Sequence, residues 1–308
     1  MTDYTSVLTG EERISLALRE LYSRNGFDHY RMSKFEEYDL YVRNKDFLVS
    51  DNVITFTDTD GRLLALKPDV TLSIIKNMKC SPEGVSKLYY DENVYRVSRD
   101  TGSFREIRQT GVECIGRVDT ATVADILALA ALSLDTVASE YRLELSHIDI
   151  VSGMLAELGV GDETRRSFFG LLGEKNVHDA RELLAAEGVS EEAADAVCAL
   201  VSLCGSADEV LPELRSIVRG DMAEGALAEL ETIVSHLGSL GLGDKLRLDF
   251  SVVNNTGYYN GIAFCGYAEG VPAAVLIGGQ YDNLMRKMGR SSRAVGFAVY
   301  VDALARRR

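Results

Sequence analysis

The chain has 308 residues, roughly twice the length of a typical single domain, so it can bury a large core. Hydrophobic residues make up 46% and charged residues 26%, with 27 Gly and 4 Pro, which excludes collagen-like, disordered and coiled-coil classes. Lys and Arg total 33 against 47 Asp and Glu, giving a net charge of −14. Such a charge repels polyphosphates, so nucleic acid is not expected as a partner.

The chain also lacks the usual signals for secretion, membranes and metals. Residues 1–13 have no basic segment followed by an apolar one, and no apolar run approaches the roughly 18 residues of a membrane span. We therefore expect a cytoplasmic protein with no membrane partner. The five cysteines include no CxxC pair and the four histidines no HExxH motif, so neither a metal site nor histidine-based catalysis is expected.

The first third of the chain alternates between helical and strand patterns. Apolar residues at helical spacing predict an amphipathic helix between Gly10 and Gly26. Short alternating runs over 47–66, split by Asp60-Gly61, predict a β-hairpin. After a break at residues 67–69, the pattern predicts a short helix at 71–78 and then two antiparallel strands, at 86–99 and 103–117.

The stretch from about 119 to 243 is rich in Ala, Leu and Glu, which predicts a mainly helical insertion with one strand at 143–151. Strand patterns return after Gly243, and residues 294–308 predict a strand that leads into a helix. The expected fold is α+β: one domain over 1–308, built on an antiparallel sheet flanked by helices and interrupted by the helical insertion.

Polar clusters lie within the predicted strands and at their ends. No GxGxxG or GxxxxGK[ST] loop is present, so the common phosphate cradles are missing. Alternate residues of a strand share a face, so Arg105, Gln109 and Glu113 should point the same way. The simplest alternative is the solvated side of a sheet. Tyrosines at 258–259 and glycines at 278–279 favour a ligand site instead, because they place rings and accessible backbone near strand ends.

Taken together and in order, these clusters resemble the catalytic core of histidyl-tRNA synthetase, a class II aminoacyl-tRNA synthetase. Residues 87–116 resemble motif 2 of that family, GYYNGIAF at 257–264 its histidine-specific segment, and GGQYDNL at 278–284 the segment before motif 3. The resemblance extends over nearly the whole chain. It implies the class II antiparallel sheet and a homodimer formed near the opening helix and hairpin.

The same resemblance implies a pocket for histidine. Asp69 would hold the α-ammonium group, although it is one methylene shorter than the glutamate usual in the family. Thr71 and Gln109 would complete that contact, and Glu113 would accept a hydrogen bond from an imidazole nitrogen. The hydroxyl of Tyr258 or Tyr259 would engage the other edge of the ring. A neutral imidazole carries one donor and one acceptor nitrogen, which suits this set of groups.

The nucleotide site implied by the resemblance is incomplete. Arg96 and Arg105 remain in place, and we interpret them as a vestige of that site. Other positions of the synthetase motifs have changed: Ser98 replaces a glutamate, and arginines are replaced by Ser103, Asn254, Gln280 and Ala303. Losing one such donor typically costs about 10²–10³ in rate. We therefore expect no catalytic residues and no cofactor, and because the chain stops at Arg308, no anticodon-binding domain.

A synthetase-like core without these parts resembles the family of regulatory subunits of ATP phosphoribosyltransferase. That resemblance implies a non-catalytic role in histidine biosynthesis. The partner would be the short-form catalytic subunit, bound by homodimers within a hetero-octamer, with histidine as the feedback effector. Two alternatives stay open: a truncated or atypical histidyl-tRNA synthetase that still forms the adenylate, and a synthetase-like paralogue with another amino-acid-dependent role.

Overall fold

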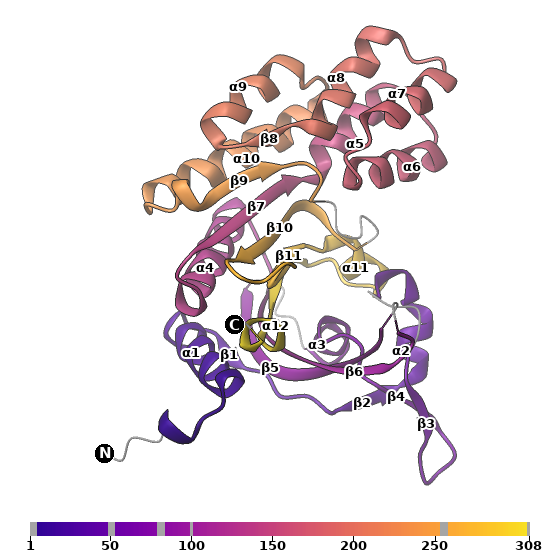
Figure 1. Ribbon diagram of the computed structural model, residues 1–308. Coiled ribbons are helices and arrows are strands. Elements are labelled where there is room, and N and C mark those ends of the chain that lie inside the picture. Colours follow the sequence, from indigo (N-terminus) through magenta and orange to yellow (C-terminus); the bar gives the residue numbers. More distant parts are fainter. Residues whose placement is uncertain (1–4, 49–52, 79–83, 99–100, 253–257, 307–308) are drawn as a thin grey trace.

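A mixed sheet of nine strands forms the centre of the molecule (Figure 1). The computed structural model describes residues 5–48, 53–78, 84–98, 101–252 and 258–306. In spatial order the strands are β1 (Asp28–His29), β5 (Val85–Val97), β6 (Phe104–Gly116), β12 (Arg293–Tyr300), β11 (Leu276–Gln280), β10 (Asn260–Ala268), β7 (Tyr141–His147), β9 (Leu246–Asp249) and β8 (Cys204–Gly205). The sheet is mainly antiparallel, as predicted, and the parallel pairs are β1 with β5 and β7 with β9.

A smaller antiparallel sheet contains the predicted hairpin. Its order is β2 (Phe35–Glu37), β4 (Leu63–Leu66), β3 (Thr55–Thr57). Gly61, in the turn between β3 and β4, has a φ of 81°, which a residue without a Cβ adopts at little cost. The hairpin is therefore confirmed, with strands shorter than the predicted range. Two helices adjoin this sheet in the sequence, α2 (Tyr38–Arg43) and α3 (Thr71–Asn77), and short 3₁₀ turns lie at Thr5–Val7, Lys45–Phe47 and Gly243–Lys245.

The opening helix is confirmed as α1 (Gly10–Arg24), and its start is fixed by a capping box. The Thr9 hydroxyl accepts from the backbone N–H of Glu12, and the Glu12 carboxylate accepts from the N–H of Thr9. Leu18 and Tyr22 on its inner face are fully buried. They pack with α4 (Thr120–Val137) and α12 (Val301–Ala305) over one face of the large sheet.

Helix α4 is long and apolar enough to cross a membrane by length and composition alone. The expectation that no segment approaches such a span therefore fails for this helix. The reason is structural, because α4 is a core helix: Ile126, Leu127, Ala130 and Leu134 are buried against the sheet and α1. A mostly buried helix of a soluble core passes the same test, so its composition indicates packing rather than a lipid environment.

A group of helices stands beyond the β7-β9-β8 end of the sheet, at the top of Figure 1. Its members are α5 (Ile148–Glu157), α6 (Asp162–Gly173), α7 (Val177–Ala186), α8 (Glu191–Ser202), α9 (Ala207–Ile217) and α10 (Asp221–Ser239). The strand predicted at 143–151 ends at His147, and the β-branched run after it begins α5 instead. Within the predicted insertion, α4 and β7 lie with the main sheet, so the limits of a separate insertion domain stay a prediction.

The other face of the large sheet has its own apolar cluster. It joins α3, the small sheet and α11 (Asp282–Lys287) to side chains of β5, β6 and β12. The aromatic residues Tyr90, Tyr258 and Tyr281 belong to this cluster. The predicted polar residues therefore point into a region enclosed by aromatic and aliphatic side chains.

Candidate functional site

The register of β5 and β6 places the predicted polar residues on one face. Arg105 lies opposite Arg96, Gln109 opposite Glu92, and Glu113 opposite Leu88. All belong to alternating positions whose side chains point to the same side of the sheet. Ile115, the next residue on this face of β6, belongs to the second apolar cluster. The prediction that Arg105, Gln109 and Glu113 share a face is thus confirmed, and this face is covered at Gln109 and Glu113 while Arg105 is exposed.

Glu113 is 2% exposed, and the buried cluster that it forms with Thr71, Tyr258, Tyr259 and Tyr281 is called the Glu113 cleft below. The hydroxyl of Thr71 donates to its Oε1 over 2.6 Å, and the hydroxyl of Tyr281 donates to its Oε2. Burial raises the pKa of the Glu113 carboxyl to about 8, against the opposing effect of these two hydrogen bonds, and the nearby Asp69 charge raises it further. Glu113 therefore presents a buried carboxyl that no cation neutralises among the described residues.

The strand beside Glu113 has a glycine where a side chain would fill this space. Gly296 of β12 lies opposite Glu113, and a Cβ built on it would collide with the Glu113 carboxylate and lie 2.5 Å from the backbone oxygen of Val112. The backbone oxygen cannot rotate away as a flexible side chain can. Gly296 thus makes room for the carboxyl group and for whatever contacts it.

We expect Gly296→Ala to destabilise the fold by about 1–3 kcal/mol, because the added methyl group overpacks a buried site. It should also displace Glu113 and weaken ligand binding. Chemical denaturation and ligand titration measure the two effects. Gly225→Ala in α10 is a matched control, since a Cβ there meets nothing within 4 Å. Equal stability of both variants would show that the cleft tolerates the extra atom.

Three tyrosines enclose the cleft around Glu113. The ring of Tyr258 lies 4.6 Å from that of Tyr259 and 5.8 Å from that of Tyr281, centroid to centroid. Tyr259 lies against Gly279, where a side chain would clash with its ring. Burial raises the pKa of all three hydroxyls, so each stays protonated and can donate a hydrogen bond. The structure thus brings Tyr258 and Tyr259 together with Glu113.

Tyr281 is a site residue that the sequence analysis did not assign. It follows Gly278-Gly279 in a cluster that was recognised, so the signal was present. The sequence did not give the strand order. In the structure β12 lies between β6 and β11, and Tyr281, which follows β11, spans β12 to reach Glu113 on β6. Gln280, its neighbour, is fully buried, and its Oε1 accepts from the backbone N–H of Ile262 over 2.8 Å.

Thr71 is the first residue of α3 and Asp69 lies two residues before it, and the Thr71 hydroxyl joins this segment to Glu113. The Asp69 carboxylate accepts from the backbone N–H of Leu72 at 2.9 Å. Burial raises the pKa of Asp69, and the Leu72 N–H and the Arg96 charge oppose that rise. Because the Thr71 hydroxyl gives its proton to Glu113, its free lone pairs can only accept. Gln109 is buried on the neighbouring strand. Asp69 and Thr71 therefore both offer oxygen atoms that can accept hydrogen bonds from an ammonium group.

The vestigial nucleotide residues lie next to the loop of the β5–β6 hairpin. Arg96 is half-buried and Arg105 is exposed. The backbone N–H of Ser98 donates to the oxygen of Ser103, so two of the changed positions close the base of the hairpin loop. Ala303 packs with the core on the α1 face of the sheet. Asn254 lies outside the described residues.

A buried ion pair anchors the segment that precedes α3. Lys67 is fully buried, and its Nζ lies 2.6 Å from the carboxylate of Glu92 on β5. The backbone oxygen of Lys67 accepts from Tyr95, and the backbone N–H of Lys67 donates to Lys34. Asp69 is two residues further along, so these contacts fix its place relative to β5.

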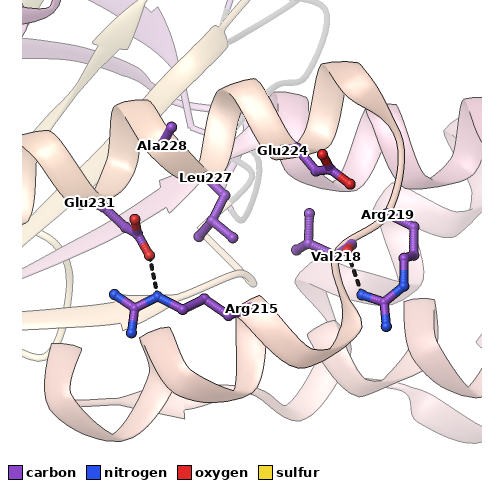
Figure 2. Close-up of a pocket in the computed structure, with 7 residues that line it drawn as sticks. All are labelled: Arg215, Val218, Arg219, Glu224, Leu227, Ala228 and Glu231. Carbon is purple, nitrogen blue, oxygen red and sulfur yellow. Dashed lines mark hydrogen bonds and ion pairs between the residues drawn. The ribbon is translucent and has the colours of Figure 1, made fainter.

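Two polar features lie outside this cleft. Helices α9 and α10 border a hollow of about 430 Å³, which Figure 2 shows, with an ion pair of 2.6 Å between Arg215 and Glu231 across it. The lining residues are Arg215, Val218, Arg219, Glu224, Leu227, Ala228 and Glu231. On α7, the exposed side chains of His178, Asp179 and Glu182 bring their ligand atoms within 4.8 Å of one another. None of these residues belongs to the Glu113 cleft.

Comparison with known proteins places this arrangement. A family model described as histidyl-tRNA synthetase matches residues 8–304. The ATP phosphoribosyltransferase regulatory subunit of Caldanaerobacter subterraneus subsp. tengcongensis is 30% identical over 289 residues, which is 92% of this chain and 75% of that protein. The chain belongs to the histidyl-tRNA synthetase family, among its ATP phosphoribosyltransferase regulatory subunits.

Solved structures agree with this membership. The ATP phosphoribosyltransferase regulatory subunit/histidyl-tRNA synthetase from Bacillus halodurans C has a TM-score of 0.85 and 26% identity, and the match covers 96% of this chain and 78% of that one. The ATP phosphoribosyl transferase (HisG:HisZ) complex from Thermotoga maritima has a TM-score of 0.73 at 17% identity, with 94% and 96% covered, which shows a shared fold. The α+β class II synthetase-like fold is thereby confirmed.

Proposed function

We propose that the chain is a non-catalytic regulatory subunit of ATP phosphoribosyltransferase that binds histidine in the Glu113 cleft. The observation that carries the proposal is the buried Glu113 carboxyl, held between the hydroxyls of Thr71 and Tyr281, with the ring of Tyr258 packed beside Tyr281. A carboxyl and a phenol on opposite sides of a ring suit the two nitrogens of an imidazole. Asp69, two residues before Thr71, would be the acceptor for an α-ammonium group.

The absence of catalysis follows from charge. Adenylate formation concentrates negative charge on phosphate oxygens, and preorganised cations must meet it there. Four positions at which the resemblance implies an arginine have neutral residues here, namely 103, 254, 280 and 303, while the acceptors around Glu113 remain. Among the open alternatives, a synthetase that retains adenylation predicts histidine-dependent exchange of pyrophosphate into ATP. We expect no such exchange.

The binding test is calorimetric titration of the chain with histidine. We expect Glu113→Ala and Gln109→Ala each to weaken binding at least tenfold, because each removes a buried polar contact. Glu106→Ala is the matched control. Glu106 lies on the same strand and is exposed, and its side chain points to the opposite face of the sheet from Gln109 and Glu113. Parent-like binding by both cleft variants would contradict the assignment of the pocket.

The proposed partner is a short catalytic subunit of ATP phosphoribosyltransferase, in a hetero-octamer of about four plus four chains. The names of the relatives support a transferase complex. Co-expression followed by native mass spectrometry would give the subunit count. Feedback inhibition would require histidine to bind the active and less active assemblies with different affinity, a coupling that is typically about 1–3 kcal/mol. As a biosynthetic subunit, the chain would work in the cytoplasm.

The homodimer proposed within that assembly has a candidate surface on the small sheet. Phe35 on β2 and Phe56 on β3 are 46% and 38% exposed, and their rings are 5.6 Å apart on the outer face. We expect a Phe35→Ser/Phe56→Ser variant to shift the chain toward monomer in analytical ultracentrifugation, because it removes exposed apolar area. Leu240→Ser, at a position just after α10 that is 52% exposed, should leave the mass unchanged. A dimer that persists in the double variant would place the interface elsewhere.

A further inference from the structure

Tyr300 is the last residue of β12, and the strand register puts its side chain on the face of the Glu113 cleft. Gly296 lies opposite Glu113 on β6, and Tyr300 lies opposite Gln109. Alternate residues of a strand share a face, so Tyr300 points to the same side as Glu113. Tyr300 is half-buried, and its backbone N–H donates to the oxygen of Val275 over 2.8 Å. These contacts fix the tyrosine beside Gln109.

The hydroxyl of Tyr300 lies near those of two other tyrosines. Tyr90 on β5 reaches across Gly111, where a Cβ would lie 2.5 Å from the Tyr90 hydroxyl. Tyr259 lies against Gly279 on β11, on the other side of β12. Burial is the main cause of the raised pKa of Tyr90 and of Tyr259, and the Tyr300 hydroxyl raises both further. Tyr300 therefore projects from β12 toward the cleft and borders it.

The cleft face of β12 changes from small to large side chains at Tyr300. The alternating residues of this face are Ala294, Gly296, Ala298 and Tyr300. The small residues leave the room that the Glu113 carboxyl occupies and that a ligand bound to it needs. The ring of Tyr300 ends this room at the level of Gln109.

The proposed histidine contacts decide which end of the ligand lies near Tyr300. The imidazole would meet Glu113, and the α-ammonium group would meet Asp69 and Gln109. In an α-amino acid the ammonium and carboxyl groups are attached to the same carbon atom. A substituent on the carboxyl group therefore begins a few bonds from the ammonium contact, and Tyr300 lies directly opposite Gln109.

We propose that Tyr300 restricts the Glu113 cleft to free amino acids, because its ring occupies the space into which a group joined to the carboxyl carbon would extend. The inference rests on the proposed histidine-binding function and names the class of ligand that the cleft admits. Tyr300 is then a specificity-determining residue that acts by a clash with the wrong ligand. An aminoacyl-adenylate is excluded by shape as well as by the missing cations.

The test is calorimetric titration of the full chain with L-histidine and with histidyl-sulfamoyl adenosine, a stable analogue of the aminoacyl-adenylate. We expect the parent to bind the analogue about 30-fold or more weakly than histidine. Tyr300→Ala should bind histidine within about threefold of the parent and bind the analogue about tenfold or more tightly than the parent does, because the ring is gone. Tyr300→Phe keeps the ring and should exclude the analogue as the parent does.

Tyr267→Ala is the matched control. Tyr267 is also a half-buried tyrosine of the large sheet, and it lies near the far end of β10, opposite Arg142. Its removal should change the affinity for neither ligand. A gain in analogue binding by Tyr267→Ala equal to that of Tyr300→Ala would show a general loosening of the sheet and would overturn the inference. Tyr300→Thr, which keeps a side chain suited to a strand, provides the same test if the alanine variant is unstable.

The outcomes separate this inference from the proposed function. If the parent binds neither ligand, the proposed function fails. If the parent binds both ligands alike, or if Tyr300→Ala leaves the ratio of the two affinities unchanged, the inference fails while histidine binding stands. Loss of histidine binding in both Tyr300→Ala and Tyr300→Thr would mean that Tyr300 holds the amino acid itself, which also contradicts exclusion by shape.

Discussion

Replacing Glu113 with glutamine is expected to stabilise the ligand-free chain at pH 9 and to change its stability little at pH 5. The cause is the buried carboxyl, whose pKa burial raises from 4.5 to about 8. Glutamine has nearly the same shape and can accept a hydrogen bond from Thr71 or Tyr281, yet it never becomes charged. The variant therefore avoids the cost of burying an anion.

The direction with pH follows from proton linkage. The folded chain holds the Glu113 proton more tightly than the unfolded chain, so the stabilisation from that proton is complete below pH 4.5. It is lost as the pH rises through about 8. The full effect is on the order of 5 kcal/mol, and the part between pH 6 and 9 is roughly 3 kcal/mol. The free energy of unfolding of Glu113→Gln relative to the parent should therefore rise by roughly 3 kcal/mol between pH 6 and 9.

Urea unfolding of the parent and Glu113→Gln at several pH values measures this difference. Glu12→Gln is a control of opposite sign, because hydrogen bonds from the backbone and side chain of Thr9 lower the pKa of Glu12. That variant should lose stability at neutral pH and become parent-like in acid. A stability difference between Glu113→Gln and the parent that does not vary with pH would show that Glu113 is ionised, or solvated, throughout.

Local patterns were sufficient to predict the elements and one face of the site. The alternation of β6 placed Arg105, Gln109 and Glu113 together, and the capping residues around Thr9 agree with a helix that begins near Gly10. The residues after His147 were assigned wrongly because Ile148, Ile150 and Val151 are β-branched and the run is short. Their strand propensity favoured an extended conformation, but packing against α10 and β10 stabilises the helix α5 instead.

Contacts between distant segments could not be predicted from local patterns. Tyr281 reaches Glu113 across 168 residues, and Lys67 reaches Glu92 only because residues 67–68 run beside β5. The parallel pairing of β7 with β9 spans the whole helical group. The family resemblance supplied the fold class, but neither the order of the strands nor the side chains that complete the cleft.

The ion pair of Lys67 and Glu92 should have one of the largest effects on stability in the chain. We expect Glu92→Leu to cost about 3–5 kcal/mol, because it leaves the Lys67 ammonium buried without a partner. Burial already lowers the pKa of Lys67, and Glu92 is the main group that opposes this shift. Glu36 cannot readily replace it, since its carboxylate is bound to Lys76 at 2.8 Å.

The double variant Lys67→Met/Glu92→Leu should recover most of that loss, because no charge is then buried and the two side chains can pack together. Urea unfolding of the parent, the two single variants and the double variant gives the interaction energy. Histidine titration of the double variant adds a functional readout, since the backbone bonds of Lys67 to Lys34 and Tyr95 survive and should keep Asp69 in place. A double variant no more stable than Glu92→Leu would contradict this. It would mean that the segment before α3 depends on the ion pair itself, and that removing both charges does not restore its stability.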